Sequence, residues 1–290
     1  MWTICKREIR ASIQRVPVIV YMALMLLAFG ILVYYYHISS ANGDLSSALF
    51  DSRYALLLTV PILCMSSMSQ DKKRGIDGFW RAMPVSTGAV VLGKYFAMLV
   101  VTLIPLTVMS VYILLLSLFA KSPNLADAFV CMGVYFLMQA ALVALCQFIS
   151  SLTSNRWISL AGGILSTAAM LFLPVLGAFM PDRLWISLVG FGVLALAVGV
   201  AVGFFTRSVF VGIGGGVVLA TPVIVMLIAF RGALASMLDA VLNVVSPFYH
   251  FEVTYGASIL YPTTIVALAA FTALFVYMTV VSARESRVRR

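Results

Sequence analysis

Residues 95–120, YFAMLVVTLIPLTVMSVYILLLSLFA, contain no acidic, basic or histidine side chain. A helix of about 20 apolar residues is long enough to cross the hydrocarbon core of a bilayer. The whole chain has the same character, because 63% of its 290 residues are apolar, 10% are charged and the mean hydropathy is +1.09. A soluble domain of this length would lack the polar residues needed to cover its surface. The sequence therefore predicts a membrane protein.

Further apolar runs of similar length lie on both sides of this one. They predict an all-α polytopic membrane protein with about eight transmembrane helices, or six if residues 157–230 contain a re-entrant hairpin. The predicted spans are Val18–Tyr36, Tyr54–Met68, Tyr95–Ala120, Ala128–Ser150, Trp157–Met180, Leu184–Phe205, Val209–Phe230 and Thr263–Ala283.

The basic residues indicate an orientation, because they translocate poorly and collect in cytoplasmic segments. With a cytoplasmic N-terminus, every Lys and Arg lies on the cytoplasmic side except Arg53, Lys121, Arg183 and Arg231. We therefore expect both termini in the cytoplasm of a bacterial-type inner or plasma membrane. Topology and anionic lipid then explain the net charge of +9 without a nucleic-acid partner. The alternative for the first run, a signal peptide, is less favoured because the run exceeds a typical signal core.

The predicted spans contain none of the side chains that ion-coupled carriers use. Asp, Glu, Lys, Arg and His are absent from them, whereas proton relays and ion pathways usually place such a group inside the membrane. A transport function would therefore draw its energy from elsewhere. The neutral polar residues that could line a translocation path are Gln139, Gln147, Ser66 and Ser67. The four cysteines have no metal-site spacing, and no disulfide is expected.

One long polar stretch interrupts the apolar runs, QDKKRGIDGFWRAMPVSTGAVVLGKYF at residues 70–96. Within it Ile76, Phe79, Trp80 and Met83 recur at helical spacing and predict one apolar face. Pro84 ends this helix. The stretch is either a linker anchored in the lipid headgroups or a knob that fits a groove on a soluble partner.

The same stretch resembles a known family. Arg74-Gly75, then Pro84-Val85-Ser86 and Gly93-Lys94-Tyr95, is similar to the first cytoplasmic loop of ABC-2-type permeases, the membrane subunits of ATP-binding-cassette exporters. In that family the loop carries a coupling helix that docks on a separate ATPase. The resemblance implies a cytoplasmic coupling loop at 69–94. Its coupling residues would be Arg74, Gly75, Ile76, Asp77, Phe79, Trp80, Arg81, Met83 and Pro84. Many members have Thr and Glu where this chain has Ile76 and Gly78, which leaves the subfamily open.

Two other regions agree with the resemblance. Residues 1–16 form an amphipathic pattern that predicts an N-terminal interfacial helix. Residues 231–262 resemble the external re-entrant helices before the last span, and SPFYHFE at 246–252 is similar to the gliding-motility-type branch. His250 and Glu252 could belong to an external metal or substrate site. We favour polar residues that solvate an interfacial turn, because two ligands at this spacing are a weak signal.

The resemblance implies a single transmembrane permease domain over residues 1–290, without a nucleotide-binding domain and so not itself an enzyme. Such a subunit works as a dimer, with a second copy or a homologous permease, in contact with membrane lipid and over a cytoplasmic ABC ATPase. ATP and Mg would bind to that ATPase, and no cofactor is expected in this chain. The expected function is export of an amphipathic, lipid-like or peptide substrate. An ATPase-independent carrier or channel and a non-transporting scaffold are the alternatives.

Overall fold

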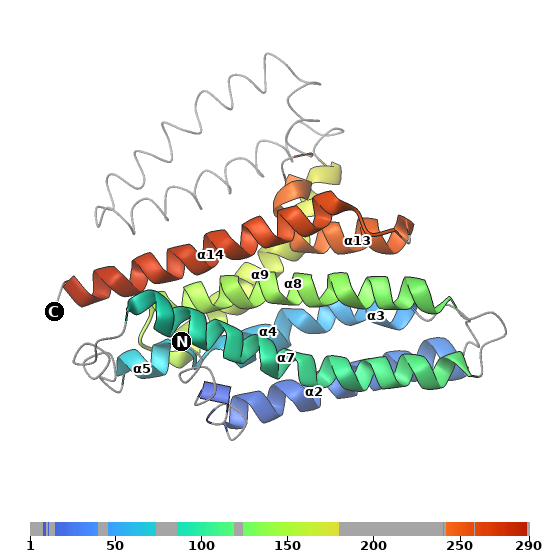
Figure 1. Cartoon of the computed structure of the whole chain (residues 1–290), viewed down its shortest axis with the longest axis horizontal. Coiled ribbons are helices and arrows are strands. Elements are labelled where there is room, and N and C mark those ends of the chain that lie inside the picture. The colour runs from blue at the N-terminus through green and yellow to red at the C-terminus, as the bar shows by residue number, and fades with distance from the viewer. Residues whose placement is uncertain are drawn as a thin grey trace, which may run out of the picture. The chain divides into compact units, whose positions relative to one another are not determined.

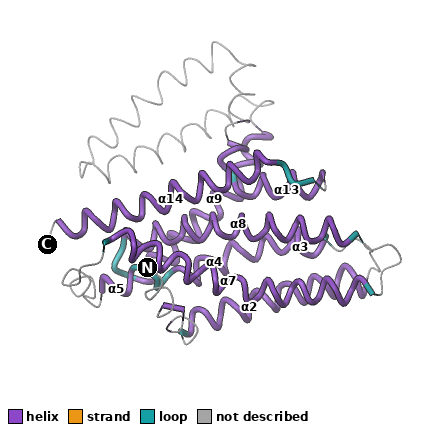
Figure 2. The backbone as a smooth tube through the Cα atoms, in the orientation of Figure 1, coloured by secondary structure: helices purple, strands orange, loops and turns teal. Residues whose placement is uncertain are grey.

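The computed structural model describes residues 8–9, 11, 15–39, 46–73, 86–118, 124–179, 240, 242–257 and 259–288. These residues form helices joined by turns and short loops, without a strand among them (Figure 2). The chain divides into two compact units, residues 1–169 with 247–290, and residues 170–246. The predicted coupling helix at 74–84, the two predicted spans between 184 and 230, and most of the predicted interfacial helix at 1–16 lie outside the described residues.

Six segments are long and apolar enough to cross a membrane, within the part of the chain that the structure describes. They coincide with six of the eight predicted spans, and the all-α class is confirmed. The six segments are Val16–Tyr36, Ser47–Lys73, Thr87–Ser117, Leu125–Leu152, Arg156–Val175 and Pro262–Arg284.

The helices themselves are labelled in Figure 1. They are α2 (Val16–Val33) with a π-helical continuation η1 (Tyr34–Ser39), α3 (Ser47–Ser52), the 3-10 turn η2 (Arg53–Ala55), α4 (Leu56–Cys64), α5 (Ser69–Lys73), α7 (Thr87–Ser117), α8 (Leu125–Leu152), α9 (Arg156–Phe179), α13 (Pro247–Ala257) and α14 (Pro262–Val288).

Helix α8 is the centre of the first unit. It contacts α4, α7, α13 and α14, and 67% of its most apolar window is buried, against 17% for α14. Tyr135, Met138 and Leu142 on α8 are fully buried. A helix that is apolar all round belongs in the core of a bundle, so α8 is the element through which the surrounding helices are connected.

The outward faces of the surrounding helices are apolar. Ile31 on α2, Val111 on α7 and Val266 on α14 are among the exposed large side chains. In water such surfaces would be unfavourable, but in lipid they are the ordinary exterior of a helix whose backbone groups are bonded internally. The outer surface of the first unit therefore suits a bilayer.

Helix α9 approaches α4 closely at a glycine. A Cβ atom added to Gly163 would lie 3.0 Å from the Cβ atom of Pro61, so a larger residue would push the helices apart. One turn further, the Thr167 hydroxyl donates to the Leu57 carbonyl across 3.2 Å. Pro61 leaves α4 with fewer backbone donors, and the helix ends at Cys64.

The second and third spanning segments begin or end beyond the apolar runs that predicted them, and their extensions carry charge. The predicted span Tyr54–Met68 becomes the broken segment from Ser47 to Lys73, and the predicted span from Tyr95 begins at Thr87. The additional residues include Arg53, Asp71 and Lys94, all of which are buried. A reading of apolar runs excludes these charged residues from the spans. It does not register that each charge is compensated by a partner from another part of the chain.

Candidate functional site

The candidate site lies at the end of the first unit where α2 and α7 begin and where α5 and α14 end (Figure 1). We call this the basic end. The basic residues in its helix termini are Arg15, Lys72, Lys73, Lys94, Arg156 and Arg284. Lys73 and Ser86, the described residues nearest to the predicted coupling helix on either side, both lie at this end.

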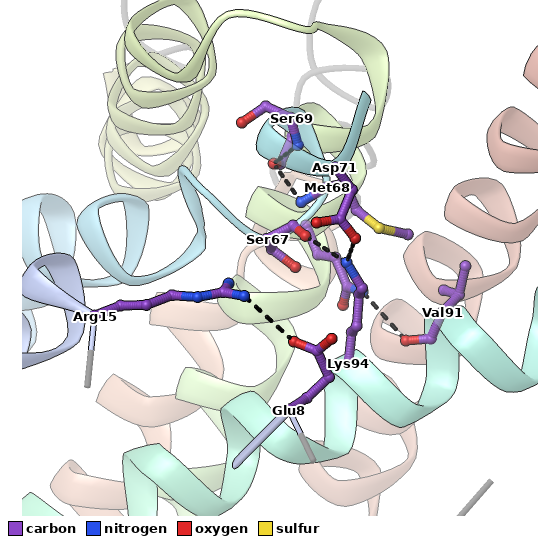
Figure 3. A network of polar contacts seen from close by, with 10 residues as sticks. Glu8, Arg15, Ser67, Met68, Ser69, Asp71, Val91 and Lys94 are labelled. Carbon is purple, nitrogen blue, oxygen red and sulfur yellow. Dashed lines mark hydrogen bonds and ion pairs between the residues drawn. The ribbon is translucent and has the colours of Figure 1, made fainter. Parts of the chain in front are cut away.

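A buried ion pair joins the two flanks of the predicted coupling helix. The Lys94 ammonium on α7 donates to the Asp71 carboxylate on α5, and also to the Ser67 carbonyl at 2.8 Å (Figure 3). The two charged side chains are only 3% and 12% exposed. A charge in such a place is tolerated only when it is paired and hydrogen-bonded. We call Asp71 and Lys94 the basic-end clamp.

The turn between α4 and α5 is fastened to the end of α8. The Ser150 hydroxyl accepts hydrogen bonds from the backbone N–H groups of Met68 and Ser69, each at 3.2 Å. The Lys72 ammonium donates to the Ser151 carbonyl. These bonds satisfy backbone donors that the break in the helix would otherwise leave unpaired. As a result, α5 is held on α8 although it has only 5 residues.

Helices α7 and α8 are also joined directly, since the Gln147 amide donates to the Val91 carbonyl at 3.2 Å. The segment before α2 contributes to the same polar network, in which Arg15 pairs with Glu8 at 3.7 Å (Figure 3). Together these contacts unite α5, α7 and α8 at the two flanks of the predicted coupling helix.

The residues predicted to line a translocation path are not brought to one place. Ser66, Ser67, Gln139 and Gln147 are all buried. Ser66 and Ser67 lie in the turn after α4, and Gln147 lies beside α7 at the same end. Gln139 is two turns further along α8, about 12 Å away, and its amide donates to the Tyr21 hydroxyl. The path formed by these residues stays a prediction.

Three side-chain oxygens among these residues have no hydrogen-bond donor within the described part of the protein. They are Gln139 Oε1, Gln147 Oε1 and Ser67 Oγ. Buried acceptors of this kind are costly in hydrocarbon. Two of them, Gln147 Oε1 and Ser67 Oγ, lie near the basic-end clamp.

Sequence reasoning missed the basic-end clamp. Lys94 was placed in the cytoplasmic loop, and Asp71 was not singled out. One signal was present, because Lys94 stands inside the apolar stretch VVLGKYFAML and directly precedes the third predicted span. A lysine so placed either reaches the headgroups or finds a carboxylate, and the nearest preceding candidate outside the predicted coupling helix is Asp71.

A second ion pair lies at the other end of the first unit. Arg53 Nη1 is 3.3 Å from Glu252 Oε2 on α13, and Arg53 Nη2 donates to the Tyr54 hydroxyl at 3.1 Å. The Arg53 guanidinium lies 3.8 Å from the centre of the Phe50 ring, which stacks on Tyr255 at 4.1 Å. We call Arg53 and Glu252 the far-end pair.

The far-end pair gives Glu252 a role other than metal binding. His250 is buried on the same helix and its ring packs edge-on to Tyr249 at 6.0 Å. Among the described residues no three His, Cys, Asp or Glu side chains are grouped closely enough to hold a metal ion. Helix α13 occupies part of the predicted re-entrant region at 231–262, and its residues Pro247, Phe248 and Phe251 are buried.

These features define a multi-pass, all-helical membrane protein with a polar stretch anchored at one end of its bundle. The family model described as ABC-2 family transporter protein matches residues 17–214. This match covers more than half of the chain, so the chain belongs to the ABC-2 transporter family. Its members are membrane components of ABC transporters and lack a nucleotide-binding domain. No curated protein and no solved structure matches the chain significantly.

Proposed function

We propose that the protein is the transmembrane subunit of an exporter that moves an amphipathic, lipid-like or peptide substrate out of the cytoplasm. A separate cytoplasmic ATPase, which binds ATP and Mg, would supply the energy by docking on residues 74–84. The observation that carries this proposal is the fixed base of the polar stretch, in which Asp71 and Lys94 are paired and buried. A base of this kind suits a segment that receives mechanical force.

In the proposed mechanism, ATP closes the ATPase dimer, and the closure displaces the helix at 74–84. Ile76, Phe79, Trp80 and Met83 would form the contact face, because their spacing predicts one side of a helix. The polar residues Arg74, Asp77 and Arg81 would set its orientation, with Gly75 and Pro84 at its limits. The displacement would open a path between two permease copies, or between this chain and a homologous permease.

The proposed orientation places the basic end in the cytoplasm. Arg15, Lys73, Arg156 and Arg284 belong to that end, whereas Asp51, Asp127 and Glu252 belong to the other. Basic residues collect on the cytoplasmic side of membranes. The guanidinium of Arg156 also lies 5.2 Å from the centre of the Trp157 ring, an arrangement that suits the headgroup region. Both termini would then be cytoplasmic.

The proposed substrate class follows from the walls that the helices offer. The interior contacts of α2, α4, α7 and α8 are apolar, with neutral polar groups such as Thr59, Thr102 and Gln139 among them. Such walls suit a molecule that has both an apolar body and a polar group.

Co-purification of the ATPase tests the proposed docking site. The genes beside this one are searched for a reading frame with a Walker A loop, the full chain is expressed with that ATPase, and Trp80→Ala is compared with Trp157→Ala. A buried interface Trp contributes about 2 kcal/mol or more, so Trp80→Ala should reduce recovery of the ATPase by about tenfold or more. Trp157 is exposed at the same end of the bundle, and its replacement should leave recovery unchanged.

Equal recovery of the ATPase with both variants would contradict the docking site. Recovery of no ATPase with the unchanged chain, together with substrate flux through liposomes that contain the chain alone, would favour an ATPase-independent carrier instead.

A further inference from the structure

We infer that the basic-end clamp transmits the displacement of residues 74–84 to α8, so that Asp71 and Lys94 are positioning residues for transport. This inference rests on the proposed function and goes beyond it. The coupling helix alone cannot move the bundle, because force on a loop is lost unless the loop's two ends move together with the elements that line the path.

The first step is that the clamp resists opening. Its ammonium and carboxylate are largely removed from solvent, and Lys94 is bound twice, to Asp71 and to the Ser67 carbonyl at 2.8 Å. Separation of the two charges would leave each buried without its main partner. The flanks at α5 and α7 therefore move as one piece.

The second step is the attachment of that piece to α8. A helix of 5 residues is too short to be stable alone, so α5 depends on its neighbours. Ser150 binds the backbone of Met68 and Ser69, and Lys72 binds the Ser151 carbonyl. A shift of α5 is thereby passed to the last turns of α8.

The third step is the reach of α8 across the bundle. Near its opposite end, the ring of Tyr135 lies 5.6 Å from that of Phe251 on α13, and the Tyr135 hydroxyl donates to the Ser52 carbonyl at 3.4 Å. Packed helices shift as rigid elements between discrete arrangements. Motion at the clamp would therefore reach α13 and the far-end pair through one continuous helix.

The test separates transmission from stability. Lys94→Met/Asp71→Leu removes both charges and replaces them with apolar groups, which is often neutral for folding because no unpaired charge remains. The single variant Lys94→Met leaves Asp71 unpaired and should lower the melting temperature by about 5 °C or more. The conservative variant Asp71→Glu keeps the pair.

The readout is a fluorophore at the far end. Ile259, just before α14, is 58% exposed and is replaced by Cys in a Cys5→Ser background, while Cys64, Cys131 and Cys146 are buried. The protein is labelled with bimane and placed in phosphatidylethanolamine/phosphatidylglycerol nanodiscs together with the ATPase. Emission is compared in Mg-ATP and Mg-ADP for the parent, Lys94→Met/Asp71→Leu and Asp71→Glu.

We expect the double variant to bind the ATPase as the parent does. Its nucleotide-dependent emission change should be about fivefold smaller than that of the parent, or less. Asp71→Glu should retain it. A full-sized change in the double variant would overturn the role of the clamp and leave the proposed function standing. A parent that binds no ATPase, or that shows no nucleotide-dependent change, would overturn the proposed function and the clamp's role with it.

Discussion

The basic-end clamp and the far-end pair each have one partner on the segment from Ser47 to Lys73, yet the two ion pairs differ in their exposure to solvent. Lys94 and Asp71 are 3% and 12% exposed, whereas Arg53 is 9% and Glu252 is 56% exposed. An ion pair open to solvent on one side gains little net stability, but a buried one becomes costly when a single partner is removed. The comparison indicates that the ion pair at the basic end stays closed and that the ion pair at the far end can separate.

The two pairs also differ in the parts of the chain that they join. The basic-end clamp links residues 23 positions apart and closes the base of one loop, whereas the far-end pair links residues 199 positions apart. The far-end pair ties the second spanning segment to α13, which directly precedes the last one. Its separation would remove one tie between α13 and the second spanning segment without opening the base of the loop. Four predictions test this difference, in order of decreasing effect.

The largest effect is expected from Lys94→Met. This change leaves the Asp71 carboxylate buried without its ammonium and should lower the free energy of unfolding by about 3–5 kcal/mol. The measurement is an SDS titration in mixed micelles. Lys73→Met removes an exposed charge from α5, the short helix that carries Asp71. It should change the free energy of unfolding by no more than about 0.5 kcal/mol. Similar losses of stability in the two variants would show that burial of the Asp71–Lys94 pair does not make its disruption more costly.

The next effect is expected from Ser150→Ala, which removes the acceptor for two backbone N–H groups. Unsatisfied buried donors cost about 1–3 kcal/mol, so the same titration should detect a loss in that range. Ser110→Ala is the control, because among the described residues the Ser110 hydroxyl donates within its own helix, to the Thr107 carbonyl. A loss from Ser110→Ala as large as that from Ser150→Ala would argue against the attachment of α5 to α8.

A smaller effect is expected from Arg53→Met at the far end. The change removes the ion pair, the bond to Tyr54 and the contact with the Phe50 ring, but it leaves Glu252 half exposed and able to reach water. We expect a loss of about 1–2 kcal/mol. A loss that equals or exceeds that of Lys94→Met would reverse the comparison between the two ends.

The smallest effect is expected from Glu252→Gln, which keeps the shape of the side chain and removes its charge. The loss should be below about 1 kcal/mol, and it should shrink further in 1 M NaCl, where charges are screened within about 3 Å. The double variant Lys94→Met/Asp71→Leu is the matched comparison at the other end. A salt-independent loss from Glu252→Gln would mean that the far-end pair is shielded from solvent as thoroughly as the clamp.

Much of the fold could be predicted because length and hydropathy decide which segments can cross a bilayer. The runs beginning at Val18 and Ala128 predicted α2 and α8 to within a few residues. The second span was predicted poorly, as the run from Tyr54 to Met68 covers only the middle of a broken helix. Its ends at Ser47 and Lys73 are polar, so hydropathy alone shortens it.

The candidate site was predictable only in part. The interruption at 70–96 was recognisable from its charge and aromatic residues. Ser67 and Gln147, which the sequence offers as lining residues of a translocation path, are buried at the basic end, and that path stays a prediction. Nothing in the spacing of Asp71 and Lys94 showed that they meet, because their pairing depends on how α5 and α7 pack against α8. Arg53 and Glu252 are still further apart in the chain, and a sequence pattern carries no signal for such a contact.

By itself, the sequence determined that this chain is a bundle of membrane helices with one polar stretch, since the transfer of apolar side chains into lipid depends on local composition. Only the tertiary structure decided which charges are buried and which partners compensate them. The electrostatic cost of burying a charge is set by neighbours in space, and those neighbours are brought together by helix packing rather than by position along the chain.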